Sequence, residues 1–502
     1  MHKGEVKMIS VSEVKIFNKL FIGGEWVSPH SGRLIQSINP ATEEVWAEVA
    51  EADEVDVDLA VKAARAALHG PWKKWTATKR GAALRKFGDL LLENAESLSI
   101  LESNDNGKPT RDTLGEIKRS AEWLYYYAGA ADKIQGETIP YQPDALAYTR
   151  REPVGVVGAI TPWNSPISMY SWKIGPALAA GNTIVIKPAE ITPVTAMELA
   201  RISEEAGFPP GVINVIPGYG KIAGSALAKH PLVNKIAFTG EHTTAQSIMK
   251  DASGSLKRLS FECGGKSPHI IFDDADFDKA LTVAVNSAFR STGQSCSLGS
   301  RLFVQKGIYE KFVHELIERV KKIRVGMPLD ENTHIGPHTS KAQLDKTLKY
   351  ISIGKEEGAK LEIGGKQPKE FSRGYFVEPT VFTGVSNQSR LAQEEIFGPV
   401  LSIIPFESDE DVLEMANNVP YGLVAGLWTR DIKRAHRLAA EIEAGFISIN
   451  TYRPIHWTLP YGGYKLSGFG RENGLEALHE YTEVKTIVVD LSEEAPSDPF
   501  KD

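Results

Sequence analysis

Short apolar runs alternate with longer amphipathic stretches through the middle of the chain. Four runs rich in Val and Ile lie at residues 154–160, 183–187, 212–216 and 235–238. Their apolar residues are consecutive rather than alternating with polar ones, which is typical of strands covered on both faces. The stretches between and after them have helical periodicity and are long enough for crossovers between parallel strands. We therefore predict a doubly wound α/β sheet over about residues 153–264. The expected helices of this sheet lie at residues 169–181, 195–207, 221–230 and 243–253.

A second alternating set follows and predicts a second α/β domain. Its expected helices lie at residues 274–289, 309–323 and 409–419, and its expected strands at 301–305, 401–406 and 446–450. Two segments, 149–153 and 481–490, fit neither set. The later segment ends as an apolar strand, and such a strand needs a sheet edge to pair with, for which another subunit is one candidate.

The bulk properties exclude several classes of protein. A chain of 502 residues exceeds what one hydrophobic core usually serves, so we expect two or three domains. The net charge is −7 and no block of Lys and Arg stands out, so we expect no nucleic-acid partner. No apolar run reaches the roughly 18 residues that span a bilayer, and Lys7, Glu13 and Lys15 interrupt the start of the chain where a leader would be apolar. We therefore expect a cytoplasmic protein with no membrane partner.

Polar or glycine-rich segments follow the four predicted strands of the first sheet and a fifth predicted strand that precedes residue 262. They are residues 161–164, 187–190, 217–220, 238–240 and 262–266. Ligands of an open parallel sheet bind beyond the carboxyl ends of its strands, so these segments predict a binding crevice. Each segment also has a plainer interpretation, because Pro and Gly after a strand often mark only a turn, and a Glu there often reaches solvent or an ion pair.

The chain has only two cysteines, Cys263 and Cys296, too few for a disulfide framework or a zinc site, so we expect no metal. Cys263 follows Glu262 in an extended run and therefore points to the opposite face, where we expect a small core residue. Cys296 lies in the polar, glycine-flanked stretch STGQSCSLGSR, where a structural thiol gains little from burial. Cys296 is therefore the candidate nucleophile.

Seven segments, taken together and in order, resemble the aldehyde dehydrogenase superfamily over roughly residues 18–490. They are TPWN, IKPAE, FTG, FECGGKSP, GQSC, EEIFGPV and PYGGYKLSGFGRE. The resemblance implies an α/β fold with a Rossmann-type cofactor domain, an α/β catalytic domain and a small oligomerisation segment. It also implies a homodimer or homotetramer. The implied boundaries are residues 12–130 and 153–264 for the NAD-binding domain, 265–470 for the catalytic domain, and 131–152 and 475–492 for oligomerisation.

The same resemblance implies the chemistry: an aldehyde is oxidised to its acid through a thiohemiacetal and a thioester on Cys296. Glu262 matches the general base that activates the hydrolytic water, and Asn164 matches the side chain that donates to the oxyanion. Lys173 and Glu472 match positions proposed to relay protons from the base.

The implied cofactor is NAD, with NADP less favoured. Lys187 and Glu190 match residues that hold the adenosine ribose, and Glu395, with Phe397 nearby, matches the contact to the nicotinamide ribose. A carboxylate at Glu190 can accept hydrogen bonds from ribose hydroxyls and would repel a 2′-phosphate. Further expected cofactor contacts are Ile160, Thr161, Pro162, Trp163, Gly220, Phe238, Thr239, Gly240, Glu241 and Gly264.

Three positions depart from the family pattern. Glu241 stands where Ser is usual, Ala245 where a second Gly is usual, and Ser165 where an aromatic residue often follows Asn164. A carboxylate at Glu241 weakens binding of phosphates unless it turns away. Ser165 disfavours a purely apolar substrate.

The loop after residues 446–450 completes the expected substrate contacts. Arg453 at its start can grip a carboxylate or a polar carbonyl, or alternatively pair with an acidic surface residue. The residues leave aliphatic, aromatic, amino- and carboxy-aldehydes open as substrates. The residues expected to contact the substrate are Ser165, Trp172, Arg453, Ile455 and Tyr461.

Three other functions are alternatives to hydrolytic oxidation of an aldehyde. In a CoA-acylating semialdehyde dehydrogenase CoA takes the acyl group, and Glu262 argues against this because hydrolysis needs that base. A non-catalytic structural relative would not need Cys296, Glu262 and Asn164 together. A thiol hydrolase would need a His partner for Cys296, and the sequence offers no credible one.

Overall fold

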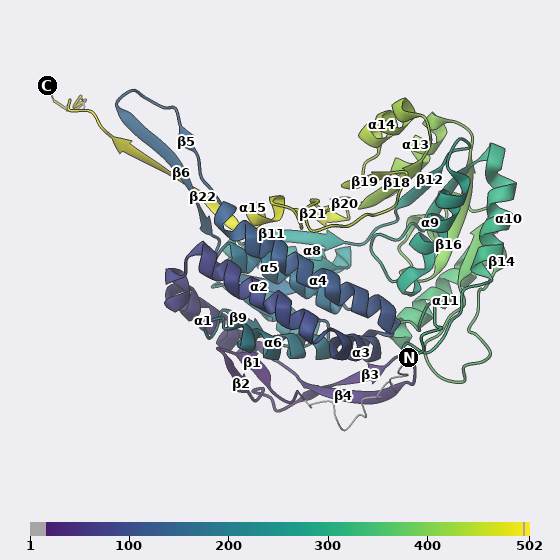
Figure 1. Ribbon diagram of the computed structural model, residues 1–502, viewed down its shortest axis with the longest axis horizontal. Coiled ribbons are helices and arrows are strands. Elements are labelled where there is room, and N and C mark those ends of the chain that lie inside the picture. Colours follow the sequence, from purple (N-terminus) through teal and green to yellow (C-terminus); the bar gives the residue numbers. More distant parts are fainter. Residues whose placement is uncertain (1–16, 495–496, 502) are drawn as a thin grey trace, which may run out of the picture.

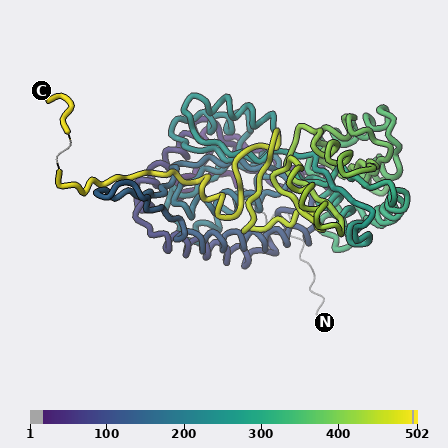
Figure 2. The backbone as a smooth tube through the Cα atoms, turned by 90° about the horizontal axis from the view of Figure 1, so that it is seen from above, coloured from purple at the N-terminus to yellow at the C-terminus, as the bar shows by residue number. Residues whose placement is uncertain are grey.

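A computed structural model describes residues 17–494 and 497–501 of the chain. Residues 1–16, on which the expectations about a leader and about a cofactor domain starting at residue 12 fall, lie outside the described residues. Two α/β units form the body of the molecule, and an arm projects from it (Figures 1 and 2). No helix among these residues is both long and apolar enough to cross a membrane.

The first unit is built on an eight-stranded sheet of order β2-β1-β9-β8-β7-β10-β11-β21. Its five inner strands are parallel, and β1 and β21 pair antiparallel at its two sides. The four strands predicted from the apolar runs are all present as β7 to β10. The bounds are β1 Leu20–Ile22, β2 Glu25–Val27, β7 Val156–Ile160, β8 Thr183–Lys187, β9 Ile213–Val215, β10 Lys235–Gly240, β11 Arg258–Cys263 and β21 Gly468–Phe469.

Helices cover both faces of this sheet, as the consecutive apolar residues predict. Alternate residues of β7 enter different cores: Val157 and Ala159 pack against α2, α4, α5 and α6, whereas Val156 and Ile160 pack against α1, α7 and α8. Helices α2, α4 and α5 lie side by side in Figure 1. The bounds are α1 Glu54–His69, α2 Ala77–Glu93, α3 Ala95–Asn106, α4 Thr110–Ala130, α5 Pro166–Ala179, α6 Val194–Ala206, α7 Ser225–Lys229 and α8 His242–Ala252.

The strand order places the first parallel strand, β7, in the middle, with β8 on one side and β10 on the other. The chain winds outward in both directions from β7, so the crevice between β7 and β10 is the topological switch point where such sheets bind ligands. One predicted helix differs from the expectation. Residues 221–230 begin as a π-type turn, Gly220–Gly224, and only then continue as α7, because glycine at both ends of the turn weakens the regular helix.

The second unit is a seven-stranded sheet of order β14-β15-β16-β13-β12-β18-β19, parallel except for β14. The strands predicted at 301–305, 401–406 and 446–450 are present as β13, β16 and β19, and all three predicted helices are present. The short strands β12 and β18 were not predicted. The bounds are β12 Pro268–Ile271, α9 Phe277–Phe289, β13 Arg301–Gln305, α10 Tyr309–Val320, α11 Lys341–Glu356, β14 Lys360–Ile363, β15 Thr380–Thr383, β16 Val400–Phe406, α13 Asp409–Asn417, β18 Val424–Trp428, α14 Ile432–Glu441 and β19 Phe446–Ile449.

The two segments that fitted neither domain pair with each other. Strand β22, Thr482–Asp490, lies antiparallel to β6, Ala145–Pro153, with all nine residues of each in register. Strand β5, Thr138–Ile139, completes this sheet, which forms the projecting arm (Figure 1). The sheet edge that β22 needs is therefore supplied by its own chain, and β22 itself remains an outer strand.

Short elements complete the fold. The antiparallel strands β3 and β4 lie beside α3. A second antiparallel pair, β17 and β20, lies next to β21. The bounds are β3 Leu34–Asn39, β4 Glu44–Ala50, α12 Arg390–Gln393, β17 Tyr421–Gly422, β20 Tyr464–Lys465 and α15 Glu476–Glu480.

A buried arginine ties the second sheet to the segment that follows Glu262. The side chain of Arg301 is fully buried and donates to the carbonyl oxygens of Lys266, Met415 and Ala416 at 2.8–2.9 Å. Burial lowers the pKa of this guanidinium to about 9. No acidic partner lies within ion-pair distance in the described residues, so the backbone carbonyls and the amide oxygen of Asn387, 3.2 Å from Nη1, stabilise its charge.

Replacing Arg301 by Met should lower the free energy of unfolding by about 3 kcal/mol, because several buried carbonyl groups lose their donor. Urea denaturation followed by fluorescence measures the change. The matched control is Arg373→Met, since Arg373 is exposed and pairs only with the exposed Glu44. The control should change the free energy of unfolding by less than about 1 kcal/mol. Similar values for the two variants would contradict the structural role of Arg301.

Candidate active site

A cavity of about 490 Å³ lies at the carboxyl ends of β7, β10 and β11. Residues after these strands line one side of it, and residues 290–297, between α9 and β13, line another. The sequence-predicted crevice therefore meets the loop that carries Cys296. Among the residues that the structure describes, no group of three or more His, Cys, Asp or Glu side chains is placed to hold a metal ion.

The loop that carries Cys296 is strained and closely held. Ser291 and Thr292 adopt left-handed backbone conformations, with φ of 55° and 57°, which non-glycine residues rarely do. The Thr292 hydroxyl donates to the carbonyl of Gly336 at 3.0 Å, and the backbone N–H of Thr339 donates to Gln294 Oε1 at 3.0 Å. Contacts from the second unit thus compensate for the strain.

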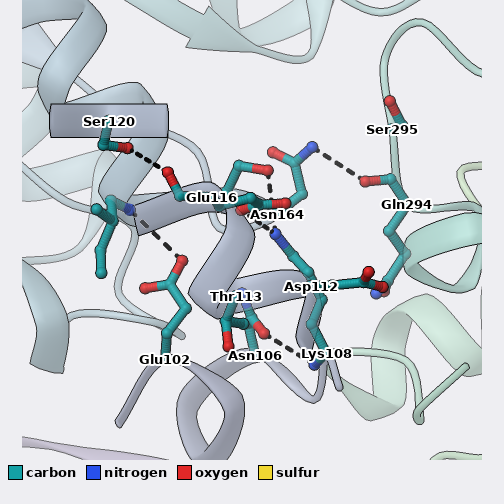
Figure 3. Close-up of polar contacts among 12 residues, drawn as sticks. Glu102, Asn106, Lys108, Asp112, Thr113, Glu116, Ser120, Asn164, Gln294 and Ser295 are labelled. Atoms are coloured by element: carbon teal, nitrogen blue, oxygen red, sulfur yellow. Dashed lines mark hydrogen bonds and ion pairs between the residues drawn. The ribbon is translucent and has the colours of Figure 1, made fainter. Parts of the chain in front are cut away.

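Asn164 joins this loop from the opposite side of the cavity. Its Nδ2 donates to the carbonyl oxygen of Gln294 at 3.0 Å (Figure 3). This bond uses one amide hydrogen and fixes the plane of the amide, and both Asn164 and Cys296 line the cavity. The second amide hydrogen is therefore available to an oxygen atom bound there.

The Cys296 thiol lies in a setting that opposes ionisation. Burial raises its pKa to about 11, and the carboxylates of Glu395 and Glu262 act in the same direction. Two groups act against them: the Tyr461 hydroxyl, whose oxygen lies 3.8 Å from Sγ, and the guanidinium of Arg453. A reaction at this thiol therefore needs a group that accepts its proton.

Arg453 contacts the same loop directly. Its Nη1 donates to the hydroxyl oxygens of Ser295 and Ser297, the latter at 3.0 Å, and these two residues flank Cys296. The backbone of Arg453 is itself left-handed, with φ of 42°. The acidic surface partner considered for Arg453 is absent from the described residues, where this side chain forms no ion pair. Arg453 lines the cavity, as expected for a residue that contacts substrate.

Glu262 is the last but one residue of β11 and lines the cavity while only 5% exposed. Neither carboxylate oxygen has a hydrogen-bond partner among the described residues. Burial raises the pKa of Glu262 well above its usual value, and the neighbouring Glu472 adds to this shift, whereas Lys173 and Arg471 oppose it. A buried carboxyl group of this kind is a strong enough base for a proton transfer near neutral pH.

Lys173 and Glu472 form a buried ion pair next to Glu262. Lys173 comes from α5 and is fully buried, and Glu472 is 4% exposed. The second oxygen of Glu472 has no partner among the described residues. Neither residue lines the cavity, so they lie behind Glu262 rather than beside a substrate.

Cys263 behaves as the sequence analysis predicts. It points away from the cavity into the core between the first sheet and helices α1, α7 and α8, and it is 2% exposed. Burial raises the pKa of its thiol to about 12. Cys263 is therefore an inert core residue, and Cys296 is the reactive candidate of the two.

The residues expected around the nicotinamide line the cavity beside Cys296. Glu395 Oε1 accepts a hydrogen bond from the N–H of Gly265 at 3.0 Å, and burial raises the pKa of Glu395 to about 7. A Cβ atom at Gly264 would lie 2.1 Å from Glu395 Oε2, so only glycine leaves room for this carboxylate. Phe397, with φ of 63°, packs edge-on against Trp163 at 5.1 Å. The other expected residues on this side are Pro162, Thr239, Gly240 and Glu241.

The remaining expected cofactor residues lie outside the cavity at the strand ends. Lys187 Nζ pairs with Glu190 Oε2 at 2.9 Å. Burial alone would raise the pKa of Glu190, but Lys187 and the backbone N–H of Gly220 lower it overall. Burial also lowers the pKa of Lys187. Ile160, the residue before Thr161, pairs in register with Lys187 and Phe238, so these positions lie in one row along the sheet edge.

The two departures near α8 have different surroundings. Glu241 immediately precedes the helix, is exposed and makes no capping bond with its side chain. It still lines the cavity, close to the positive end of α8, where a carboxylate would repel the phosphates of a cofactor unless it turns away. Ala245 is 5% exposed and packs in the core under the sheet, where a methyl group fits.

The far side of the cavity holds residues that the sequence analysis expected and others that it missed. Ser165, Trp172, Ile455 and Tyr461 line it as expected. Helix α4 contributes Glu116, Arg119 and Trp123 to the lining of the cavity. Arg290, the residue that follows α9, also lines it. None of these residues was predicted. Gln343 was also missed, although it supports Phe397 by donating to the carbonyls of Ile396 and Phe397. No sequence motif marks α4, whose polar residues look like an ordinary exposed helix face.

Comparison with known proteins agrees with the fold. The model of the aldehyde dehydrogenase family matches residues 26–487. The chain belongs to the aldehyde dehydrogenase family. It is 47% identical to aldehyde dehydrogenase 1A1 of Rattus norvegicus over 480 residues, which cover 95% of each chain.

Solved structures of aldehyde dehydrogenases also resemble this chain. An NAD⁺ complex of aldehyde dehydrogenase from Bacillus cereus is 46% identical, with a TM-score of 0.94 and coverage of 95% of this chain and 98% of that one. A betaine aldehyde dehydrogenase from Staphylococcus aureus in complex with NAD⁺ is 39% identical, with a TM-score of 0.96 and coverage of 98% and 99%.

The surroundings of Cys296 predict how this aldehyde dehydrogenase reacts with iodoacetamide when no ligand is bound. Because the pKa is about 11, the thiolate is on the order of 10⁻⁴ of the population at pH 7. Alkylation should therefore accelerate about tenfold per pH unit from pH 7 to 10 without levelling off. Tyr461→Phe should slow it at every pH, because the variant loses a donor to the thiolate. A Cys296→Ser control reports the reaction of Cys263, and a rate that levels off near pH 8 would contradict the prediction.

Proposed function

We propose that the chain oxidises an aldehyde to its carboxylic acid with NAD, through a thioester on Cys296 that water hydrolyses. The observation that supports this most directly is the convergence of Cys296, Asn164 and Glu262 on one cavity at the switch point of the first sheet. A nucleophile, an oxyanion donor and a base are the three groups that such a reaction needs.

The first step forms a bond between Cys296 Sγ and the carbonyl carbon. The thiol proton passes to Glu262 when this carboxyl group is ionised, and the carbonyl oxygen becomes an oxyanion. The free amide hydrogen of Asn164 and the backbone N–H of Cys296 donate to that oxygen, and the bond from Asn164 to Gln294 keeps the amide in place before the reaction. NAD, when bound, supplies the hydride acceptor.

The second step releases the acyl group from Cys296. Glu262 removes a proton from water, whose oxygen attacks the thioester carbon, and the thiolate leaves. The raised pKa of Glu262 suits it to this role. The buried Lys173–Glu472 pair behind it offers a route for the proton away from the cavity, since Glu472 keeps one free oxygen.

The residues along the sheet edge fit NAD. Lys187 and the backbone N–H of Gly220 hold the carboxylate of Glu190, which stays partly exposed. The exposed part can accept hydrogen bonds from the two hydroxyls of the adenosine ribose. Glu395 and Phe397 would hold the nicotinamide ribose and ring beside Cys296. Gly264 leaves room there for the Glu395 carboxylate. Glu241 is exposed at the start of α8 and can turn towards solvent.

The assembly and the location remain predictions. The arm of β5, β6 and β22 fits the expected oligomerisation segments, and its outer strand β22 exposes Val484 and Val488, so we propose a homodimer or homotetramer that covers this face. We also propose a cytoplasmic location. The buried, partner-free Glu262 favours hydrolysis over transfer of the acyl group to CoA.

The hydrolytic role of Glu262 predicts a kinetic signature for Glu262→Gln. The amide cannot take a proton from water, so a burst of NADH of about one equivalent per site should precede a steady rate reduced by roughly 10²-fold or more. The burst should be slower than in the unmodified enzyme but keep its amplitude, because the amide cannot take the thiol proton either and this proton must pass to solvent. Stopped-flow absorbance at 340 nm measures both phases. Cys296→Ala is the control and should give neither burst nor turnover while it still binds NAD. Equal loss of burst and steady rate in Glu262→Gln would exclude this role.

The surroundings of Glu190 predict the choice of cofactor. The enzyme should prefer NAD to NADP in kcat/KM, because the Glu190 carboxylate repels a 2′-phosphate. Glu190→Gln should narrow the ratio about tenfold, since the amide removes the repulsion. The matched control is Glu198→Gln. This change also removes a carboxylate that takes part in an ion pair, here with Arg201, but Glu198 is not among the expected cofactor contacts. Equal use of both cofactors by the unmodified enzyme would show that this interpretation is wrong.

A further inference from the structure

We infer that the natural substrate is an aldehyde whose far end carries an anionic group, and that Arg119 and Arg453 recognise this group. The inference rests on the proposed aldehyde oxidation and specifies its substrate class. It comes from the charges that line the half of the cavity on the far side of Cys296 from Glu395 and Phe397. Helices α4 and α5, residues 290–291 and the loop at 453–461 form this half.

The acidic side chain in this half is already neutralised. Glu116 forms an ion pair with Lys108 at 2.7 Å (Figure 3). Lys108 is only 2% exposed, so the pair is held inside the protein. Lys108 also donates to the Ser165 hydroxyl at 3.1 Å, which connects the pair to the residue after Asn164. A bound substrate therefore meets no uncompensated carboxylate there.

The basic side chains in this half are only partly neutralised. Arg290 donates to Asp112 through two nitrogens, at 2.9 and 3.2 Å, so this charge is paired. Arg119 and Arg453 have no ion-pair partner in the part of the chain that the structure describes. Two uncompensated guanidinium groups thus line the substrate half of the cavity, and the forked donors of arginine match a carboxylate or a phosphate.

The rest of the lining suits a short carbon chain with a polar end. Trp123 stacks on Trp172 at 5.4 Å, and Trp172 packs edge-on against Tyr461, which gives an apolar wall next to Cys296. Hydroxyl groups also line the cavity, where they can donate further hydrogen bonds to an anion. They belong to Ser165, Ser168, Ser291, Ser295 and Ser297.

A cationic substrate is the main competitor for this cavity. Stacked tryptophans can bind a quaternary ammonium group, and one similar structure is a betaine aldehyde dehydrogenase. In this chain, however, such a cation would share the same cavity half with Arg119 and Arg453 and be repelled by both. An anion is attracted by both, so the sign of the charge decides between the two classes.

Arg119 offers the cleaner test of the two arginines. Arg453 also holds Ser295 and Ser297 on either side of Cys296, so its replacement disturbs the nucleophile as well as the tail site. Arg119 is exposed on α4 and touches no residue of the proposed catalytic set by hydrogen bond or ion pair. Its neighbour Lys118 is exposed on the same helix and does not line the cavity, which makes it a matched control.

The experiment compares four aldehydes of similar length whose far ends are a carboxylate, a phosphate, a methyl group and a trimethylammonium group. NADH formation gives kcat/KM for the unmodified enzyme, Arg119→Gln and Lys118→Gln. We expect the better of the two anions to exceed the uncharged aldehyde at least tenfold, mainly through KM. Arg119→Gln should reduce this ratio about 5- to 20-fold, and Lys118→Gln should leave it unchanged. The KM for the anion should also rise with ionic strength.

Preference for the methyl or trimethylammonium aldehyde would overturn the inference, and so would an unchanged ratio in Arg119→Gln. The carboxylate and phosphate arms identify which anion is preferred, and either one supports the inference. Absence of turnover with all four aldehydes would instead contradict the proposed oxidation. A failure of the substrate class is thus distinguished from a failure of the proposed function.

Discussion

The structure depends on one constraint: the loop that carries Cys296 must be held in a strained conformation between two α/β units. Ser291 and Thr292 cannot adopt left-handed backbones cheaply, so contacts from elsewhere must compensate. Asn164 supplies one contact from the first unit and Arg453 two from the second. Glycine at position 265 lets the carbonyl of Cys296 pack directly against the chain after Glu262. The nucleophile is therefore positioned by the assembled fold rather than by its local sequence.

Burial of ionisable groups is the second consequence of this arrangement. Closing the loop over the strand ends places Cys296, Glu262 and Glu395 in a setting of low polarity, and each pKa rises. A raised pKa weakens the thiol as an acid and strengthens Glu262 as a base. The first effect opposes transfer of the thiol proton and the second favours it, so the raised pKa of Glu262 offsets the raised pKa of Cys296 and lets the thiol react with a base that the enzyme itself provides.

The sequence was sufficient for the parts of the fold that repeat a simple pattern. Consecutive Val and Ile residues revealed β7 to β10, because strands covered on both faces have no polar alternation. Strand β18 was not predicted, and the structure shows that at its Gly426 the ring of Tyr452 packs where a side chain would be. The contribution of α4 could not be predicted either. Glu116 and Arg119 look like solvent-exposed helix residues until the tertiary fold places them beside Cys296.

Arg453 illustrates why a residue's role cannot be inferred from its type and position alone. The sequence suggested a substrate carboxylate or an acidic surface residue as its partner, but the structure adds the hydroxyls of Ser295 and Ser297. These contacts use Nη1, and Arg453 also lines the cavity, so one side chain both holds the nucleophile loop and borders the space for the substrate tail. A bound anion would draw on the same guanidinium that helps to orient the loop. Binding of the tail and placement of Cys296 are therefore physically coupled, and a substrate with the wrong charge would disturb the nucleophile as well as bind weakly.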